Sequence, residues 1–405
     1  MPSSTGAVRA FQYGLIIFAL TALIGLANAT KIFGDISRDT LLTHLHSGTL
    51  GWITMGIIGV AIWIFDGEED TLPRSVAVSA VCTAAYVLAF WSGNFIARAI
   101  FGSIELLVII YWWWWVVRRA LAHGYNRLDV PRLSVTLGMT TLIIGSTLGV
   151  LMQILFATSG GIPQNVDLVG AHAFAQVAGY LVLVAAGVAE WRLTGGGSRS
   201  VAGQAQVWLL FLAGIVLVVG SLSGIPTLQL PATILQVVAL VIIAVRFGVP
   251  AMAVGWGSVD GARHAAIALP FLVVGIALEI MLIFAFISSE GDFTKVPSGL
   301  IPALSHAIFI GLTTNVLFAC VLALGAGRER FWPWADHVIF WGLNIGAASF
   351  IAALLVSGSA QGTGMFAHPV AFTAPIMGLS ALLAIVTFSM RLQSAAEMAP
   401  AAAPA

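Results

Sequence analysis

The most regular feature of this sequence is the alternation of long apolar stretches with short segments that hold most of the charged residues. A helix needs roughly 20 apolar residues to cross the hydrocarbon core of a bilayer. Twelve stretches come close to or exceed that length, and we expect each of them to be one transmembrane helix. They cover residues 11–29, 45–65, 75–93, 98–117, 133–157, 168–190, 205–223, 228–248, 265–288, 300–324, 336–357 and 368–391.

The composition supports a membrane protein and excludes several other classes. Of the 405 residues, 59% are hydrophobic and only 8% are charged, against about 25% charged residues in a soluble domain. The net charge of +0 offers no basic surface for nucleic acid. The two cysteines, Cys82 and Cys320, lie in apolar stretches and suggest neither a disulfide framework nor a zinc site. The partner that the sequence predicts most clearly is the lipid bilayer.

The basic residues predict the orientation. With the N-terminus inside, 13 of the 17 lysines and arginines lie in inner segments, and the other 4 are Lys31, Arg38, Arg98 and Lys295. Because inner loops are enriched in these residues, we expect a multi-pass protein of the cell membrane with both termini in the cytoplasm. The tail, residues 396–405, is rich in alanine and proline and is expected to be disordered.

Histidines recur with a long period. His44 and His46 open the second predicted helix, His172 opens the sixth and His306 opens the tenth, at steps of roughly 130 residues or four helices. This predicts an all-α membrane protein whose twelve transmembrane helices form three four-helix arcs with pseudo-threefold symmetry. The arcs cover roughly residues 1–130, 131–262 and 263–395 of a single membrane domain. All four imidazoles then lie in the outer third of the membrane, where ionisable groups are functional candidates.

The spacing of the first two histidines constrains what they can bind. Successive residues of a helix turn by about 100°, so positions i and i+2 point to opposite sides. His44 and His46 therefore cannot bind one metal on one face. They can serve two sites that flank the helix.

The stretch "THLHSGTLGW" resembles the tenth helix of subunit I of the heme-copper oxidases, which in C-type members carries H-x-H-S/A-G-A-L-G-W. The residues that match are His44, His46, Ser47, Gly48, Leu50, Gly51 and Trp52. In that family the first histidine binds a high-spin heme and the second a low-spin heme, within twelve helices in three arcs. The chain is more loosely similar to the NnrS family, twelve-helix heme- and copper-containing proteins linked to nitric oxide metabolism.

The resemblance implies one or two hemes, of b type. The preferred pair of ligands is His46 with His172, and the alternative pair is His46 with His306. His44 would face the neighbouring gap and could hold a second heme with an open position, with His306 as a distal group or a possible copper ligand. Copper itself is not supported, because the family's histidine pair on the seventh helix has no counterpart in residues 205–223. Supporting roles are expected for Gly48, Gly51, Trp52 and Gln176.

Other polar residues lie within the predicted helices. Glu105 and Glu279 are either parts of a proton relay or paired structural carboxyls. His123, His264 and His337 fall near the inner membrane edge and are predicted to be interfacial.

The sequence thus favours a heme-binding redox protein that takes electrons from a donor such as cytochrome c or quinol, and that handles oxygen or nitric oxide. If it is an enzyme, it is an oxidoreductase of terminal-oxidase or nitric-oxide-reductase type. Two alternatives stay open. One is a heme- or copper-dependent sensor or assembly factor without turnover. The other is a twelve-helix transporter, which the parallel threefold repeat disfavours.

Overall fold

The computed structural model describes residues 5–163, 166–289, 292–328, 330 and 332–397. The regular structure in this part of the chain is helical, and twelve helices are long and apolar enough to cross a membrane. Each of the twelve predicted segments coincides with one of them, which confirms the predicted fold class. Most of the helices extend a few residues beyond the apolar stretch. The expected disordered tail falls largely on residues 398–405, which lie outside the described residues.

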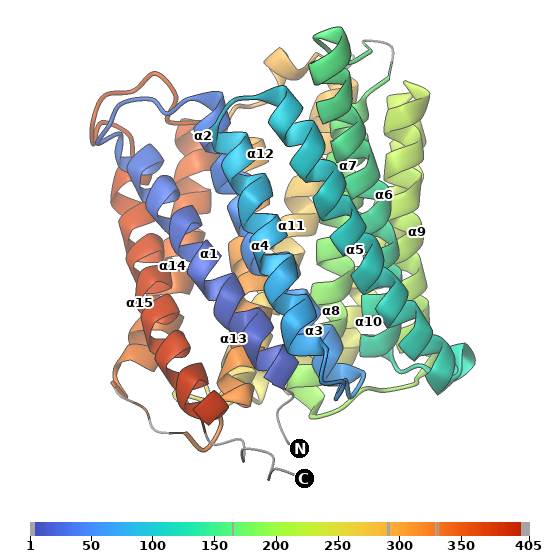
Figure 1. Cartoon of the computed structure of the whole chain (residues 1–405). Helices are drawn as coiled ribbons and strands as arrows, with labels where there is room; N and C mark the ends of the chain where they lie inside the picture. The colour runs from blue at the N-terminus through green and yellow to red at the C-terminus, as the bar shows by residue number, and fades with distance from the viewer. Residues whose placement is uncertain (1–4, 164–165, 290–291, 329, 331, 398–405) are drawn as a thin grey trace.

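The helices follow one another in three sets of four. In the first arc they are α1 (Thr5–Thr30), α2 with α3 (Arg38–His46 and Met55–Ile64), α4 (Leu72–Trp91) and α5 (Phe95–His123). In the second arc they are α6 (Val130–Ser159), α7 with α8 (Leu168–Phe174 and Leu183–Thr194), α9 (Val201–Ser223) and α10 (Leu230–Met252). In the third arc they are α11 (Ala262–Ser288), α12 with α13 (Leu300–His306 and Asn315–Leu324), α14 (Ala335–Ser357) and α15 (Val370–Glu397). As Figure 1 shows, α1 begins and α15 ends at the same end of the bundle, while α2, α7 and α12 lie at the opposite end.

Short polar caps set the limits of several helices. The Asn94 side chain accepts hydrogen bonds from the backbone N–H groups of Ile96 and Ala97 at the start of α5. Asp129 caps α6 in the same way, by accepting from Arg132 N. Such side chains satisfy donors that a helix start leaves free. Gly160 ends α6 in the left-handed conformation that glycine adopts at no steric cost.

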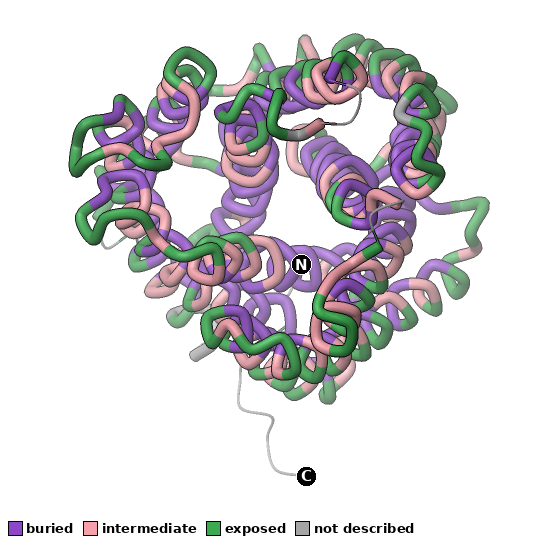
Figure 2. The backbone as a smooth tube through the Cα atoms, turned by 90° about the horizontal axis from the view of Figure 1, so that it is seen from above, coloured by how far each residue is buried: buried purple, intermediate pink, exposed green. Residues whose placement is uncertain are grey.

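The second helix of each arc lies at the centre of the molecule. In their most apolar windows, 78%, 67% and 83% of the residues are buried in spans 38–64, 168–194 and 300–324, against 28–56% in the other nine. We call these three spans the central helices. The helices around them bury one face and present the other outward, as the view from above shows (Figure 2). The outward faces are apolar, as a lipid-facing surface requires.

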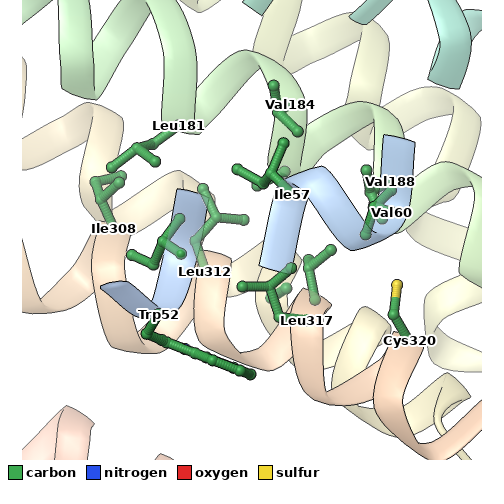
Figure 3. Packing of buried hydrophobic residues seen from close by; sticks show 14 of the residues in the cluster. Trp52, Ile57, Val60, Leu181, Val184, Val188, Ile308, Leu312, Leu317 and Cys320 are labelled. Carbon is green, nitrogen blue, oxygen red and sulfur yellow. The ribbon is translucent and has the colours of Figure 1, made fainter. Parts of the chain in front are cut away.

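Side chains of the three central helices pack against one another from the middle of the bundle toward the end that holds the two termini. Figure 3 shows this cluster, in which each central helix contributes aliphatic or aromatic residues. The residues shown there with labels are Trp52, Ile57, Val60, Leu181, Val184, Val188, Ile308, Leu312, Leu317 and Cys320. Close packing here fixes the rotation of each central helix about its axis. It thereby also fixes where the histidines at the other end of each helix point.

Candidate functional site

Each central helix changes its winding at the same place. A π-helical segment of eight residues runs from Ser47 to Thr54, from Ala175 to Val182 and from Ala307 to Thr314. Such segments are rare, are mostly single turns and are frequent at functional sites. Threonine side chains take up part of the altered bonding, because the hydroxyls of Thr54 and Thr314 donate to the carbonyls of Thr49 and Phe309, five residues back.

These segments give an internal register for the three arcs. His46 directly precedes the first segment, Phe174 the second and His306 the third. His306 is therefore the counterpart of His46. His44 and His172, each two residues earlier, are counterparts of one another, and Leu304 takes their position in the third arc. The histidines that recur in the sequence thus occupy two different positions relative to the π segments.

His46 and His306 are held by their own helix. Nδ1 of His46 lies 2.7 Å from the carbonyl oxygen of Leu42, and Nδ1 of His306 lies 2.7 Å from that of Pro302, in both cases four residues back. Each ring also contacts a phenylalanine of the next helix. His46 stacks on Phe90 with 3.8 Å between ring centroids, and the centroid of His306 lies 4.5 Å from that of Phe350.

His44 and His172 are held by the preceding helix. Nδ1 of His44 lies 2.9 Å from the carbonyl oxygen of Thr21 in α1, and Nδ1 of His172 lies 2.7 Å from that of Gly145 in α6. Each ring lies on a glycine one turn further along that helix, Gly25 for His44 and Gly149 for His172. A methyl group there would lie only 2.9 Å and 2.8 Å from the two Cε1 atoms. Glycine at these two positions thus leaves the space that each imidazole occupies.

The hydrogen bonds determine the tautomer of all four rings. A carbonyl oxygen only accepts, so Nδ1 must carry the hydrogen in each case. The lone pair then lies on Nε2, which makes no hydrogen bond within the described part of the chain and is only partly shielded, since all four residues are half-buried. A donated Nδ1–H with a free Nε2 is the arrangement found in histidines that bind metals.

The four imidazoles fall into two pairs between central helices. His46 lies within electrostatic range of His172, and His306 lies within range of His44. Each pair joins one ring held by its own helix to one ring held by the preceding helix. Of the two pairings considered from the sequence, His46 with His172 and His46 with His306, the electrostatic interaction of His46 is with His172. His44 faces the other side of its helix, where His306 lies within electrostatic range.

We call the three interfaces between central helices of different arcs gaps. The third gap, between the second and third arcs, has no histidine pair among the described residues. Phe174 and Leu304 occupy the positions that the paired histidines hold in the other two gaps. Positions one to two turns further along the central helices form a second layer, in which the third gap again differs from the other two. Trp52 Nε1 donates to Thr314 Oγ1 at 3.0 Å, and the Tyr180 hydroxyl donates to Thr54 Oγ1 at 3.3 Å. The third gap has apolar Leu312 and Val182 at these positions. At these equivalent positions of the central helices, two gaps are therefore polar in both layers and the third is apolar in both.

The number of ligands limits the chemistry. In the part of the chain that the structure describes, no three histidine, cysteine, aspartate or glutamate side chains gather as they would around a metal ion. Two imidazoles within electrostatic range of one another suit a metal whose remaining ligands come from a macrocycle, because heme iron takes only one or two ligands from the protein. The residues present therefore fit heme better than a metal held by side chains alone.

Other expected residues lie around these pairs. Trp52 is fully buried and stacks on Phe18, and Gly51 lets α1 approach closely through Ile17. Gly48 receives the Thr21 side chain, next to the carbonyl that holds His44. Gln176 donates to Ser146 Oγ at 3.3 Å and lies against Gly145, so it supports the helix that holds His172.

The structure also adds Arg98, which is within electrostatic range of His46. It is 2% exposed, and its guanidinium donates to the carbonyl oxygen of Phe90 at 2.7 Å and pairs with Asp39. From the sequence it was only an outer basic residue near the start of a helix. Its burial depends on the packing of α2 against α4.

The buried carboxyls of Glu105 and Glu279 form hydrogen bonds with residues other than the histidines. Thr83 donates to Glu105 Oε1 at 2.9 Å, and Gln236 donates to Glu279 Oε1 at 3.0 Å. His264 corrects a prediction: it is 1% exposed rather than interfacial. Its Nδ1 lies 2.7 Å from Asn315 Oδ1, because the first turn of α11 packs against α13.

Comparison with known proteins adds no relative: no protein-family model matches the sequence, and no curated protein matches it.

Proposed function

We propose that this chain is an integral membrane redox protein that binds two b-type hemes near its outer face. His46 and His172 would hold one heme, and His44 and His306 would hold the other. The observation that carries this proposal is the common state of the four rings: each donates Nδ1–H to a backbone carbonyl, keeps the Nε2 lone pair free and lies within electrostatic range of one other ring.

A bound heme would supply reversible one-electron chemistry, with a potential set by its two imidazoles and by their hydrogen bonds. The chain orients the rings through the carbonyls of Leu42, Pro302, Thr21 and Gly145, and it excludes water below them by close packing of the central helices. The Arg98 guanidinium, which pairs with Asp39, would place a positive charge close to the heme held by His46.

The match of "HLHSGTLGW" to C-type oxidase subunits, the twelve helices and the three arcs support a distant relationship to heme-copper oxidase subunit I. The excess of basic residues on one side supports cytoplasmic termini in the cell membrane. The histidines then face the outer side, where the electron partner would dock. The pair of His44 and His306 is the one at which a small gas, oxygen or nitric oxide, could displace a ligand.

The test is the reduced-minus-oxidised visible spectrum of the purified protein, with heme content measured per chain. We expect two low-spin heme signals. His46→Ala and His172→Ala should remove the same signal, while His44→Ala and His306→Ala should remove the other. Phe174→Ala, at the equivalent position in the third gap, is the matched control and should remove neither.

Carbon monoxide separates electron transfer from gas chemistry. A spectral shift that depends on His44 and His306 would mean that a ligand can be displaced at that heme, and its absence would mean an electron carrier. A protein that stays colourless after expression with ample heme would refute the proposal.

A further inference from the structure

The third gap has a buried carboxyl where the other two gaps have a glycine. The register of α1, α6 and α11 follows from side-chain contacts with the central helices. Gly48 meets Thr21, Gln176 meets Gly145, and Ile308 meets Gly275. The central-helix residue in each of these contacts is the second residue of its π segment, namely Gly48, Gln176 or Ile308.

One helical turn beyond Thr21, Gly145 and Gly275 lie Gly25, Gly149 and Glu279. Gly25 and Gly149 are the glycines on which the imidazoles of His44 and His172 rest. Glu279 therefore stands at the depth of the imidazoles. Leu304, which replaces histidine in the third arc, leaves this position without an imidazole.

The surroundings of Glu279 contain a single polar partner in the described residues. Its carboxyl is 1% exposed, and Oε1 accepts a hydrogen bond of 3.0 Å from Gln236 Nε2 in α10. Gln236 is equally buried. The other oxygens of the same two groups, Glu279 Oε2 and Gln236 Oε1, are buried and accept no hydrogen bond from the described part of the protein.

We propose that the third gap binds a proton instead of a heme: Glu279 Oε2 carries an exchangeable hydrogen that it donates to Gln236 Oε1. Both of these oxygens are acceptors as long as the carboxyl is ionised, so a single added proton provides the donor that both lack. A neutral acid also avoids the cost of a buried unpaired charge. The acid and the amide then form two complementary hydrogen bonds.

The charged groups on the helices that pack against Glu279 lie elsewhere. Arg263 and His264 are at the far end of α11, more than three turns away, and Arg246 is about 15 Å further along α10 than Gln236. Glu190 and Arg192 are at the inner end of α8. His306, on α12, donates its Nδ1–H to Pro302. None of these groups supplies a salt bridge to Glu279 among the described residues.

The proton can be observed by infrared spectroscopy of the whole protein at neutral pH. We expect a carbonyl-stretch band of a protonated carboxylic acid that shifts to lower frequency in D₂O and disappears in Glu279→Gln. Glu105→Gln is the matched control, because it removes another buried carboxyl of a membrane-spanning helix and should leave this band unchanged. The double variant Gln236→Glu with Glu279→Gln exchanges the acid and the amide and should restore the band.

Two results would overturn the inference. One is a wild-type minus Glu279→Gln difference that contains only the two stretches of an ionised carboxylate. The other is an acid band that does not shift in D₂O, which would mean a permanently locked proton. If Glu279→Gln does not fold, Gln236→Leu gives the same information, because loss of the amide should shift the acid band to higher frequency. The measurement does not depend on heme, so a colourless protein would refute the proposed function and leave this inference to be judged by its own band.

Discussion

Gly149 and Gly25 provide the sharpest test of how the imidazoles are seated, because each serves one pair only. In Gly149→Ala the new methyl would lie 2.8 Å from Cε1 and 3.0 Å from Nδ1 of His172. Carbon atoms in contact are normally about 3.5–4.0 Å apart, so the ring must move by several tenths of an ångström. That movement stretches the hydrogen bond of 2.7 Å to the carbonyl oxygen of Gly145.

The magnitude follows from two effects. A displaced hydrogen bond costs about 0.5–1.5 kcal/mol, and overpacking a close contact costs about 1–3 kcal/mol. With partial relaxation we expect about 1–3 kcal/mol, or roughly 5- to 150-fold in heme affinity. A loss of roughly 10- to 100-fold is usual when a partner of a metal-binding histidine is removed.

The assay is heme titration of the apo-protein, read as the two low-spin signals. Gly149→Ala should weaken the signal that depends on His46 and His172, and Gly25→Ala should weaken the other. Gly248→Ala is the control, because a methyl at this helical position in α10 meets nothing within 4 Å. Equal losses of both signals in both variants, or wild-type affinity in both, would refute this description of the seating.

Three further changes have defined outcomes. Phe174→His combined with Leu304→His and with Glu279→Gly, which supplies the glycine on which the other two such rings rest, should create a third pair and raise the heme content by about one per chain, which pyridine hemochrome quantification would detect; unchanged content would argue against the register of the arcs. Trp52→Phe removes the hydrogen bond of 3.0 Å to Thr314, whose hydroxyl still donates to the Phe309 carbonyl, and should lower the free energy of unfolding by about 0.5–1.5 kcal/mol, measured by thermal denaturation in detergent; an unchanged stability would contradict this role of the indole N–H. Arg98→Leu should alter the signal of the first heme far more than that of the second, as redox titration would report, and equal effects would contradict its place beside one pair.

Several features of this protein could be predicted from the sequence because they depend on properties that each segment carries by itself. A stretch of roughly 20 apolar residues is stable across a bilayer as a helix, whatever its neighbours are. The twelve helices are therefore found where the hydropathy placed them. The positions of His44, His46, His172 and His306 at one end of their helices follow from the same property. The opposite directions of the first two rings follow from helical geometry.

The partners of these histidines were decided only by the tertiary structure. Which rings meet depends on how each central helix is rotated about its axis. In helices that are apolar on all sides, no amphipathic stripe in the sequence marks that rotation. The three π segments shift the register further, and they make His306 the counterpart of His46 rather than of His172. The burial of Arg98 and His264, and the contact of Glu279 with Gln236, depend in the same way on side-by-side packing of helices far apart in the chain.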